Sequence, residues 1–450
     1  SEYLRERKRN PMLQRKIEKF LQTWKQVPQH NPLVVKGCRH CGKTTSILDF
    51  AKKEYAHVVY LNFQEKPDYA AIFRDSVDVN YLVMLITALV GPEAVFEPYR
   101  TVLILDEVQE CPEARSALKA FKMDGRYDVI AAGSLLGVKG YGKEPAPIAV
   151  GCETVVNMVP LDFEEFLWAN GITTPVLDML HQSLDKETPV PEALHLRLNE
   201  LLRQYALVGG LPEVVETYVQ THDINAVLEK QQAILRDYEE NLFVDVNKRA
   251  RAKLKTVLDA VPLQLNKENK KYQYAQLKKG SKASQFEGAL SWLEEAGIVT
   301  RCYNLTEPGL PLERHAIDSI FKVYMKDVGL YAAMLTGEDR LKLLQGDLSG
   351  CQGALYESLA ADLLSKGGRK LYYYHKNSGL EVDFVIRCQG KSTLVKATPS
   401  TGNTKSLKTL LQQPEKYQVE QAIQLTADNV SRKGQILELP LYFGFLVGSY

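Results

Sequence analysis

Residues 32–45 read PLVVKGCRHCGKTT, an apolar run that leads into a glycine-rich loop. The loop has the spacing Gly-x-x-x-x-Gly-Lys-Thr, in which backbone N–H groups surround phosphate oxygens at the positive end of the following helix. Gly37 and Gly42 permit backbone angles and a close approach that a side chain would prevent. Because the residues from Thr45 onward, TSILDFA, are amphipathic, the pattern predicts strand, loop and helix around a nucleotide.

Each residue type in this loop has an expected task. The Lys43 ammonium group is expected to reach the outer phosphates, and the Thr44 hydroxyl to hold Mg²⁺. The guanine-reading pattern Asn-Lys-x-Asp is absent from this part of the sequence, so ATP with Mg²⁺ is the expected ligand. The predicted nucleotide-binding residues are Gly37, Cys38, Arg39, His40, Cys41, Gly42, Lys43, Thr44 and Thr45.

A second motif follows the apolar strand expected over residues 101–105. Asp106 and Glu107 come at its end, and ligands collect at the carboxyl ends of strands in open α/β sheets. Asp106 is expected to hold Mg²⁺ through water. Glu107 is expected to orient and activate the attacking water, as a catalytic residue together with Lys43. Taken alone, the same pattern fits an ordinary strand that ends in solvated acids.

Three more polar residues belong to the predicted site. Ser134 follows the strand expected over residues 127–132 and is a candidate catalytic contact for the γ-phosphate or the water, although a plain turn residue fits equally well. Asn62, in the strand expected over residues 57–63, and Gln109 are expected to assist nearby. Strands that alternate with helices in this way predict a parallel α/β sheet.

Composition narrows the classes of protein to be considered. The 450-residue chain is 45% hydrophobic with a net charge of +1, which predicts two to four packed domains and no overall basic field. Its seven scattered cysteines favour free thiols in a reducing compartment over a disulfide framework. Cys38 and Cys41 form a Cys-x-x-Cys pair without a second pair nearby, which argues against zinc and leaves redox control of the loop as an alternative.

Two stretches bear on a membrane location. The first residues, SEYLRERKR, contain no apolar signal core. The longest apolar run, residues 81–90, is shorter than the ~20 residues that span a bilayer, and we expect it to form a buried helix. We therefore expect a soluble, cytoplasmic protein with no membrane partner.

Six stretches spread along the chain share the pattern of one family. They are LILDEVQECP (103–112), AAGSLLG (131–137), PLDFEEF (160–166), VGGLPE (208–213), residues 266–297 and FKVYMKDVGL (321–330). Together they resemble an abundant group of prokaryotic AAA+-type ATPases, nearly end to end. The resemblance implies nucleotide roles for the loop from Gly37 to Thr45 and for Asp106, Glu107 and Ser134.

The resemblance also implies the fold. It is α/β, with a P-loop NTPase (AAA+-like) parallel sheet, a helical lid, a winged helix and a C-terminal α/β domain of restriction-endonuclease-like fold and unknown function. The expected divisions are an N-terminal helix at 1–28, the ATPase core at 29–165, the lid at 166–240, the winged-helix region at 241–330 and the endonuclease-like domain at 331–450.

The chain departs from the family at one position. After Val150 and Gly151 the family often has Lys or Arg, and here the residue is Cys152. A second cation at the γ-phosphate raises the rate of phosphoryl transfer by orders of magnitude. We therefore expect slow hydrolysis, or a homo-oligomer in which a neighbouring subunit supplies the charge.

A basic stretch with interspersed aromatic residues precedes the amphipathic helix expected over residues 283–296. A winged helix would lay such a helix in a groove of DNA and its lysines on phosphates. A solvated charged face and a protein–protein adaptor fit the same pattern. The candidate DNA contacts are Lys270, Lys271, Lys278, Lys279 and Lys282.

The C-terminal region has part of the pattern of a restriction-type nuclease. Such an enzyme needs acids that share a metal ion and a lysine on the adjacent strand, as in Glu-x-Lys. Glu357, Asp383 and Lys396 are present, but the acid position of the last motif holds Leu394. We therefore predict a degenerate site that binds metal weakly and does not cut. The domain would instead bind DNA ends, a partner or a neighbouring ATPase.

These patterns predict an ATP-binding and hydrolysing AAA+-type ATPase that couples nucleotide state to DNA handling or defence. Two alternatives stay open. One is an ATP-gated signalling or assembly protein with incidental hydrolysis, and the other is an ATP-dependent nuclease. The expected partners are ATP, DNA, and either further copies of the chain or a partner protein.

Overall fold

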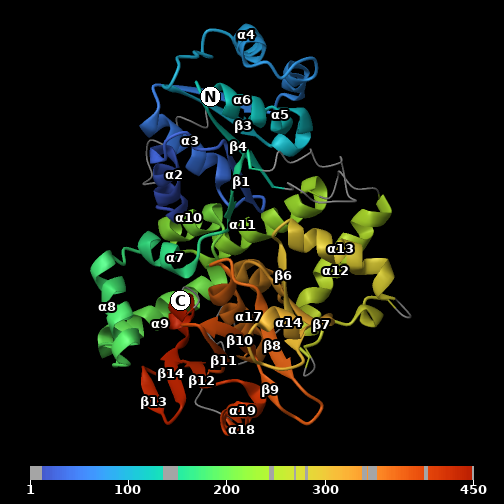
Figure 1. The fold of residues 1–450 in the computed structure, drawn as a ribbon. Coiled ribbons are helices and arrows are strands. Elements are labelled where there is room, and N and C mark those ends of the chain that lie inside the picture. Colours follow the sequence, from blue (N-terminus) through green and yellow to red (C-terminus); the bar gives the residue numbers. More distant parts are fainter. Residues whose placement is uncertain are drawn as a thin grey trace.

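The computed structural model describes residues 13–134, 151–242, 248–267, 270–278, 282–336, 342, 352–399 and 404–447. Lys279 and the stretch 135–137 therefore lie outside the described residues. In Figure 1 a sheet flanked by helices forms the upper part of the molecule, and the C-terminal strands form the lower part. Helices α10 (Pro212–Thr221) and α11 (Ile224–Asp237) lie between the two.

The upper sheet has five parallel strands in the order β2-β3-β4-β1-β5. The strands are β1 (Leu33–Gly37), β2 (His57–Asn62), β3 (Thr101–Asp106), β4 (Asp128–Gly133) and β5 (Thr154–Met158). The predicted parallel α/β sheet is confirmed. Strand β5 was not predicted, because its residues alternate between half-buried and exposed positions at the sheet edge and give a weak signal.

Helices cover both faces of this sheet, so strand β3 is buried along its whole length. One face packs against α2 and α3, through residues such as Leu21 and Phe50. The other face packs against α4 and α6, through residues such as Ile86 and Phe121. The helices are α2 (Lys16–Gln26), α3 (Lys43–Glu54), α4 (Val79–Val90), α5 (Pro112–Ser116) and α6 (Leu118–Asp124), with the 3-10 turns η2 (Pro67–Phe73) and η3 (Val108–Glu110).

The apolar run at residues 81–90 does form a helix, α4, but the structure buries only one side of it. Leu82 and Ile86 are fully buried, whereas Met84 and Leu89 are 57% and 56% exposed. The expectation of a buried helix is therefore wrong for the outer face, because the run is apolar all round while the sheet covers one side.

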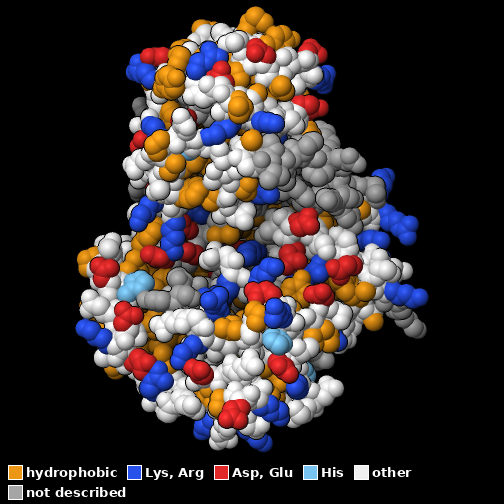
Figure 2. Space-filling view, in the orientation of Figure 1, with side chains coloured by type: hydrophobic (Ala, Val, Ile, Leu, Met, Phe, Trp, Pro, Cys, Tyr) orange, Lys and Arg blue, Asp and Glu red, His pale blue; other side chains and the backbone are white. Residues whose placement is uncertain are grey.

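Figure 2 shows hydrophobic side chains at the top of the molecule and acidic and basic groups interspersed below. Within the described residues no helix is long and apolar enough to cross a membrane.

A large hydrophobic core extends from Leu161, after the first sheet, to Val447 near the C-terminus. A separate cluster, with residues such as Tyr374 and Leu394, packs among the C-terminal strands. Phe163 packs edge to face on Phe445, with ring centroids 5.8 Å apart. The helices that lead into this core are α7 (Phe163–Ala169), α8 (Thr174–Lys186), α9 (Glu192–Val208), α10, α11 and the π-turn η4 (Tyr238–Leu242).

Three helices, a 3-10 turn and the two strands of a β-hairpin follow. They are α12 (Lys248–Leu265), the turn η5 (Tyr274–Gln276), α13 (Ala283–Glu295), β6 (Val299–Leu305), α14 (Leu312–His315) and β7 (Ala316–Met325). Strands β6 and β7 are antiparallel, and β6 also pairs in parallel with β8 (Leu371–His375) from the C-terminal region. The hairpin therefore belongs to a sheet of order β7-β6-β8-β9 that the two regions share.

The C-terminal region holds a third sheet, of order β10-β11-β12-β14-β13. Two short strands lie on either side of Asp383, β9 (Glu381–Val382) and β10 (Phe384–Cys388). The other elements are α15 (Val328–Met334), α17 (Gln352–Ser365), β11 (Lys391–Ala397), α18 (Lys405–Leu411), α19 (Pro414–Tyr417), β12 (Gln421–Thr426), β13 (Ser431–Lys433), β14 (Ile436–Pro440), η6 (Leu441–Phe443) and α20 (Gly444–Val447).

Candidate nucleotide site

The glycine-rich loop connects β1 to α3 as the sequence predicts. Gly37 ends the strand, and a Cβ atom added there would lie 2.3 Å from the carbonyl oxygen of Met158 in β5. Gly42 precedes the first turn of α3 with a φ of 90°, a left-handed conformation that side chains disfavour. Both glycines are therefore required by the local backbone, and the loop lies against the edge strand β5.

The Lys43 side chain lies along this loop. Its residue is 6% exposed, and its ammonium group donates hydrogen bonds to the carbonyl oxygens of Gly37 at 3.1 Å and Cys38 at 2.8 Å. Lys43 also lines a cavity of about 200 Å³. The walls of that cavity are Leu13, Arg15, Arg39, His40, Gly42, Lys43, Thr44, Thr45, Ser46, Glu107, Pro212, Glu213 and Glu216. Loop, second motif and lid helix thus meet at one cavity.

Thr44 and Asp106 are in direct contact. The Thr44 hydroxyl donates to Asp106 Oδ2 at 2.7 Å, and the Tyr60 hydroxyl donates to the same oxygen at 2.8 Å. Hydroxyl and carboxylate oxygens are the ligands that Mg²⁺ prefers. The pair therefore fits the metal-binding role predicted for it, and Tyr60 is an unpredicted residue that orients the carboxylate. Asn62 in turn donates to the Tyr60 hydroxyl at 3.1 Å, so it acts on Asp106 indirectly.

Glu107 lies at the edge of the same cavity in a strained conformation. Its φ is 51°, a left-handed backbone that costs about 1–2 kcal/mol for a residue with a side chain. Such strain concentrates at functional sites. Gln109 donates to Glu107 Oε2 at 2.6 Å, so the predicted assistance of Gln109 takes the form of holding this carboxylate.

Ser134 follows β4 and is buried. Because Gly133 pairs with Lys36 in the sheet, Ser134 lies one residue beyond that pair, next to the start of the loop. It is not among the described residues that line the cavity. Its contact with a γ-phosphate or water therefore stays a prediction.

Charged side chains connect the glycine-rich loop to α10 and α11, in the region predicted to be the lid. His40 lies 2.8 Å from Asp237 and 3.8 Å from Glu213, and Arg39 lies 3.0 Å from Asp237. Burial alone would lower the pKa of His40, but hydrogen bonds and charges from Glu213 and Asp237 outweigh it and raise the pKa. The turn after α13 also approaches the loop closely. A Cβ atom added to Gly297 would lie 3.2 Å from the Cβ atom of Cys38.

Arg15 is a loop contact that the sequence did not indicate. Its guanidinium donates to the carbonyl oxygens of Cys41 at 2.9 Å and Val159 at 2.7 Å, and to Glu165 at 3.2 Å. It also lines the nucleotide cavity. Nothing in the amphipathic pattern of residues 12–28 distinguishes this arginine, because its partners lie up to 150 residues away.

The two loop thiols interact with each other. A hydrogen bond from Cys38, assisted by Lys43 and opposed by burial, lowers the pKa of Cys41 to about 6, and the same bond raises the pKa of Cys38. The described cysteines are free thiols.

Cys152, which replaces the family's basic residue, precedes Glu153, and Glu153 forms a buried ion pair with Arg115 at 2.7 Å.

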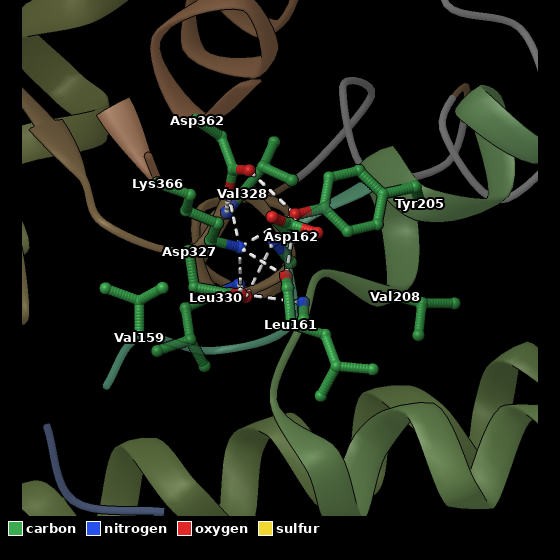
Figure 3. Close-up of polar contacts among 12 residues, drawn as sticks. Val159, Leu161, Asp162, Tyr205, Val208, Asp327, Val328, Leu330, Asp362 and Lys366 are labelled. Atoms are coloured by element: carbon green, nitrogen blue, oxygen red, sulfur yellow. Dashed lines mark hydrogen bonds and ion pairs between the residues drawn. The ribbon is translucent and has the colours of Figure 1, made fainter. Parts of the chain in front are cut away.

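A buried polar cluster joins the ATPase core to the regions that follow it (Figure 3). The Lys366 ammonium group lies 2.9 Å from Asp362 and 3.1 Å from Asp327, and it donates to the carbonyl oxygen of Leu161 at 3.1 Å. The Tyr205 hydroxyl of α9 lies within hydrogen-bond distance of Asp362 Oδ1, at 2.7 Å, and of the Leu161 carbonyl oxygen, at 3.0 Å. We call these five residues the junction cluster, because they come from four successive parts of the chain.

Asp327 extends this cluster to the lid motif. Its Oδ2 accepts the backbone N–H of Gly210 at 2.7 Å, and its Oδ1 accepts that of Gly329 at 3.1 Å. The stretches VGGLPE and FKVYMKDVGL, noted separately in the sequence, are therefore in contact. The Lys366 side chain is 1% exposed, so its charge is balanced by Asp327 and Asp362 rather than by solvent.

At the predicted nuclease site, two lysines hold the Glu357 carboxylate. Glu357 is 2% exposed; it accepts hydrogen bonds from Lys322 at 2.8 Å and from Lys270 and Tyr324. Burial alone would raise the pKa of Glu357, but Lys322 and Lys270 outweigh it and lower the pKa to about 2. Asp383 accepts the backbone N–H of Ala397 at 2.9 Å.

The remaining two nuclease positions are on β11. Leu394 is fully buried in the core, and Lys396 is half-buried one residue beyond the paired part of β10 and β11. Among the described residues no three His, Cys, Asp or Glu side chains form a group that would hold a metal ion. The degenerate nuclease site therefore stays a prediction, and Lys322 is a buried cation beside Glu357 that the sequence did not reveal.

We expect Asp383→Asn to stabilise the protein at high pH. Burial and the nearby Glu357 charge raise the pKa of Asp383 to about 6, against ~3.9 for an unfolded chain. The folded state therefore holds this proton more tightly, and stability falls as pH rises from ~4 to 6. At pH 8 the gain from Asp383→Asn should be on the order of 2 kcal/mol.

Thermal unfolding at pH 5 and pH 8 tests this expectation. The stabilisation by Asp383→Asn should be larger at pH 8 than at pH 5. Asp318→Asn, at an exposed position on β7, is the control and should show no such difference. Equal destabilisation by Asp383→Asn at both pH values would instead make Asp383 a needed ion-pair partner of Lys322.

The candidate DNA contacts divide into two groups. Lys270 and Lys271 are half-buried, and Lys270 is paired with Glu357. Lys278 and Lys282 are exposed, and both come before the first residue of α13, Ala283. Only the second group has the simple exposure expected of lysines that rest on DNA phosphates.

Comparison with known proteins gives three family matches. Residues 29–167 match the AAA domain, residues 199–341 match a domain of unknown function (DUF8612), and residues 352–442 match another domain of unknown function (DUF4143). A search of curated proteins gives no match.

Solved structures with similar folds include three nucleotide- or DNA-related proteins. The Walker-type ATPase of Pyrococcus abyssi has 14% identity and a TM-score of 0.42, over 72% of this chain and 97% of that one. The RuvB Holliday junction branch migration motor of Thermotoga maritima has 14% identity and a TM-score of 0.28, over 63% and 88%. Drosophila ORC bound to DNA has 11% identity and a TM-score of 0.25, over 73% and 94%.

Proposed function

We propose that this chain, an AAA-type P-loop ATPase with C-terminal domains of unknown function, binds ATP with Mg²⁺ and hydrolyses it beside Lys43. One observation carries the proposal. Lys43, Thr44 and Glu107 line a single cavity, and Asp106 lies 2.7 Å from the Thr44 hydroxyl behind it. The groups assigned to phosphate binding, metal binding and water activation therefore lie around one cavity.

The chemistry assigned to these residues is in-line attack of water on the γ-phosphate. Lys43 would place its charge on the β- and γ-phosphates, and Thr44 and Asp106 would hold Mg²⁺, which neutralises phosphate charge when bound. Glu107 would accept a proton from the attacking water. The oxygen of that water would bond to the γ-phosphorus as the bond between this phosphorus and the β-phosphate oxygen breaks. Gln109 would keep the Glu107 carboxylate in position before attack.

The contacts around the loop support a coupling role for nucleotide state. The lid reaches the loop through His40 and Asp237, the region after α13 reaches it at Gly297, and Arg15 reaches it from the N-terminal side. The junction cluster then connects the core to the C-terminal region. We propose that binding and hydrolysis shift these contacts together and change how the C-terminal regions handle DNA.

The region from α12 to β7 has the order of helices and hairpin expected of a winged helix. Its exposed Lys278 and Lys282 support a DNA-facing role. Because net charge is only +1, any binding must rest on such local groups. A cytoplasmic location accords with the free thiols.

The test is ATP hydrolysis by the full chain with and without duplex DNA, with mass followed by light scattering. DNA should stimulate turnover, and Glu107→Gln should remove the stimulated rate. Turnover that is indifferent to DNA, with a change of mass on ATP addition, would favour the ATP-gated assembly protein instead. The many contacts that hold the loop to its neighbours are the observation that favours this alternative.

A further inference from the structure

A second, larger cavity lies where the hairpin region meets the C-terminal region. Its volume is about 610 Å³, within the ~300–1,000 Å³ usual for ligand pockets. Lysines come from both sides, Lys270 and Lys271 before η5 and Lys376 after β8. The complete lining is Lys270, Lys271, Asn304, Ile320, Lys322, Tyr373, His375, Lys376, Asn377 and Glu381.

The charge on the walls of this cavity is strongly one-sided. Four lysines line it, and Glu381 is the one carboxylate among its described lining residues. Concave sites lined by one sign of charge concentrate ligands of the opposite sign. The site therefore suits an anion, although the chain as a whole is nearly neutral.

The walls are held in place before any ligand arrives. Asn304 of β6 donates to the carbonyl oxygen of His375 at 3.1 Å and accepts the His375 backbone N–H at 2.9 Å, which fixes the end of β8. Lys322 lies over the Tyr373 ring, 4.6 Å from its centroid. Because these side chains are already ordered, binding loses less conformational entropy than it would at a loose surface.

Glu357 anchors two of the lysines from behind the cavity. It pairs with Lys322 and Lys270, and an ammonium group has three donors, so this bond uses one donor of each lysine. The Lys270 side chain is 19% exposed and the Lys322 side chain 3%, so Lys270 is the more accessible of the two. The Glu357 carboxylate thus positions Lys322 and Lys270 at the cavity.

We propose that this cavity binds the phosphate groups of a DNA strand and holds them without cutting. Lysines from separate segments, before η5, on β7 and after β8, would each contact a phosphate group of one strand. The buried Lys322 takes the central place beside Glu357, and Leu394 removes a further carboxylate. This inference rests on the DNA-handling part of the proposed function but not on ATP hydrolysis.

The test uses the full chain and a fluorescein-labelled oligonucleotide, single-stranded or duplex, without nucleotide. Lys271→Ala/Lys376→Ala should lower affinity at least about 10-fold and reduce the slope of log affinity against log salt by about 2. Lys416→Ala is the matched control. Lys416 and Lys376 are both exposed and lie over tyrosine rings, at 4.9 and 5.7 Å, but Lys416 is outside the cavity lining.

A second pair locates the binding. Lys278→Ala/Lys282→Ala should weaken binding less than Lys271→Ala/Lys376→Ala, and the DNA should remain whole with Mg²⁺ or Mn²⁺. The inference would be overturned if Lys271→Ala/Lys376→Ala bound DNA with wild-type affinity. It would also be overturned if Lys278→Ala/Lys282→Ala lost more affinity for DNA than Lys271→Ala/Lys376→Ala. Competition by AMP as strong as that by the oligonucleotide would make this a free-nucleotide site, and cleaved DNA would refute holding without cutting.

The same preparations are assayed for ATP hydrolysis, which separates the two proposals. Hydrolysis by a protein that does not bind DNA would overturn this inference alone. DNA binding by a protein that does not hydrolyse ATP would overturn the catalytic part of the proposed function alone. Equal melting temperatures of the variants and the wild type confirm that folding is not the cause.

Discussion

Lys366→Met is expected to destabilise the protein by about 3–5 kcal/mol, because it leaves Asp327 and Asp362 as buried carboxylates without their cation. The side chains of all three are at most 4% exposed, so solvent cannot compensate. Burial alone would raise the pKa of Asp362, and loss of the Lys366 charge would add to that effect. The expected result is a lower urea midpoint and separation of the core from the C-terminal region.

Two further variants separate the effect of unpaired charge from that of lost packing. Lys366→Met/Asp362→Asn should recover part of the loss, since Asp327 keeps its backbone donors at Gly210 and Gly329. Lys370→Met, at an exposed lysine close by, should change the midpoint little. A double variant no better than Lys366→Met would show that lost packing, rather than unpaired charge, is the cause. Tryptophan fluorescence during urea titration reports both.

Glu107→Gln is expected to lower ATP turnover by about 100-fold or more while ATP still binds. A positioned general base contributes roughly 10²–10⁴ in rate, and glutamine keeps the size of the side chain without its proton affinity. The strained backbone at Glu107 and the hydrogen bond from Gln109 indicate that this carboxylate has a fixed position with a functional role. Steady-state phosphate release measures the effect.

A nearby acid provides the control for this variant. Glu113→Gln changes an exposed glutamate on α5 that is not part of the cavity lining. Its turnover should match that of the wild type. Equal turnover in Glu107→Gln and wild type would assign water activation to another group, and Ser134 would be the next residue to replace.

The local part of the site could be predicted from sequence. The loop from Gly37 to Thr45 and the acids after β3 follow from short motifs, whose residues are neighbours in the chain and whose spacing is fixed by strand, turn and helix geometry. The parallel sheet followed from strands alternating with helices. The edge strand β5 and the exposed face of α4 did not, because they depend on what covers each element.

The long-range part of the site could not be predicted. Lys366 reaches Leu161 across 205 residues, and Arg15 reaches Glu165 across 150. Lys322 gives no local signal, since a lysine on a strand normally points to solvent. Its pairing with Glu357 appears only when β7 and α17 are packed together. Charge clusters buried between distant segments are therefore what the structure adds.

Titration of the wild-type chain with ATP at saturating Mg²⁺, alongside Lys43→Ala, tests the central claim most directly. The account predicts saturable binding at one site in the wild type and a loss of affinity of at least about 10-fold in Lys43→Ala, since a charge-assisted phosphate contact is worth about 1.5–3 kcal/mol. Absence of ATP binding in the wild type, or equal binding by both proteins, would contradict the assignment of Gly37 to Thr45 as the nucleotide site.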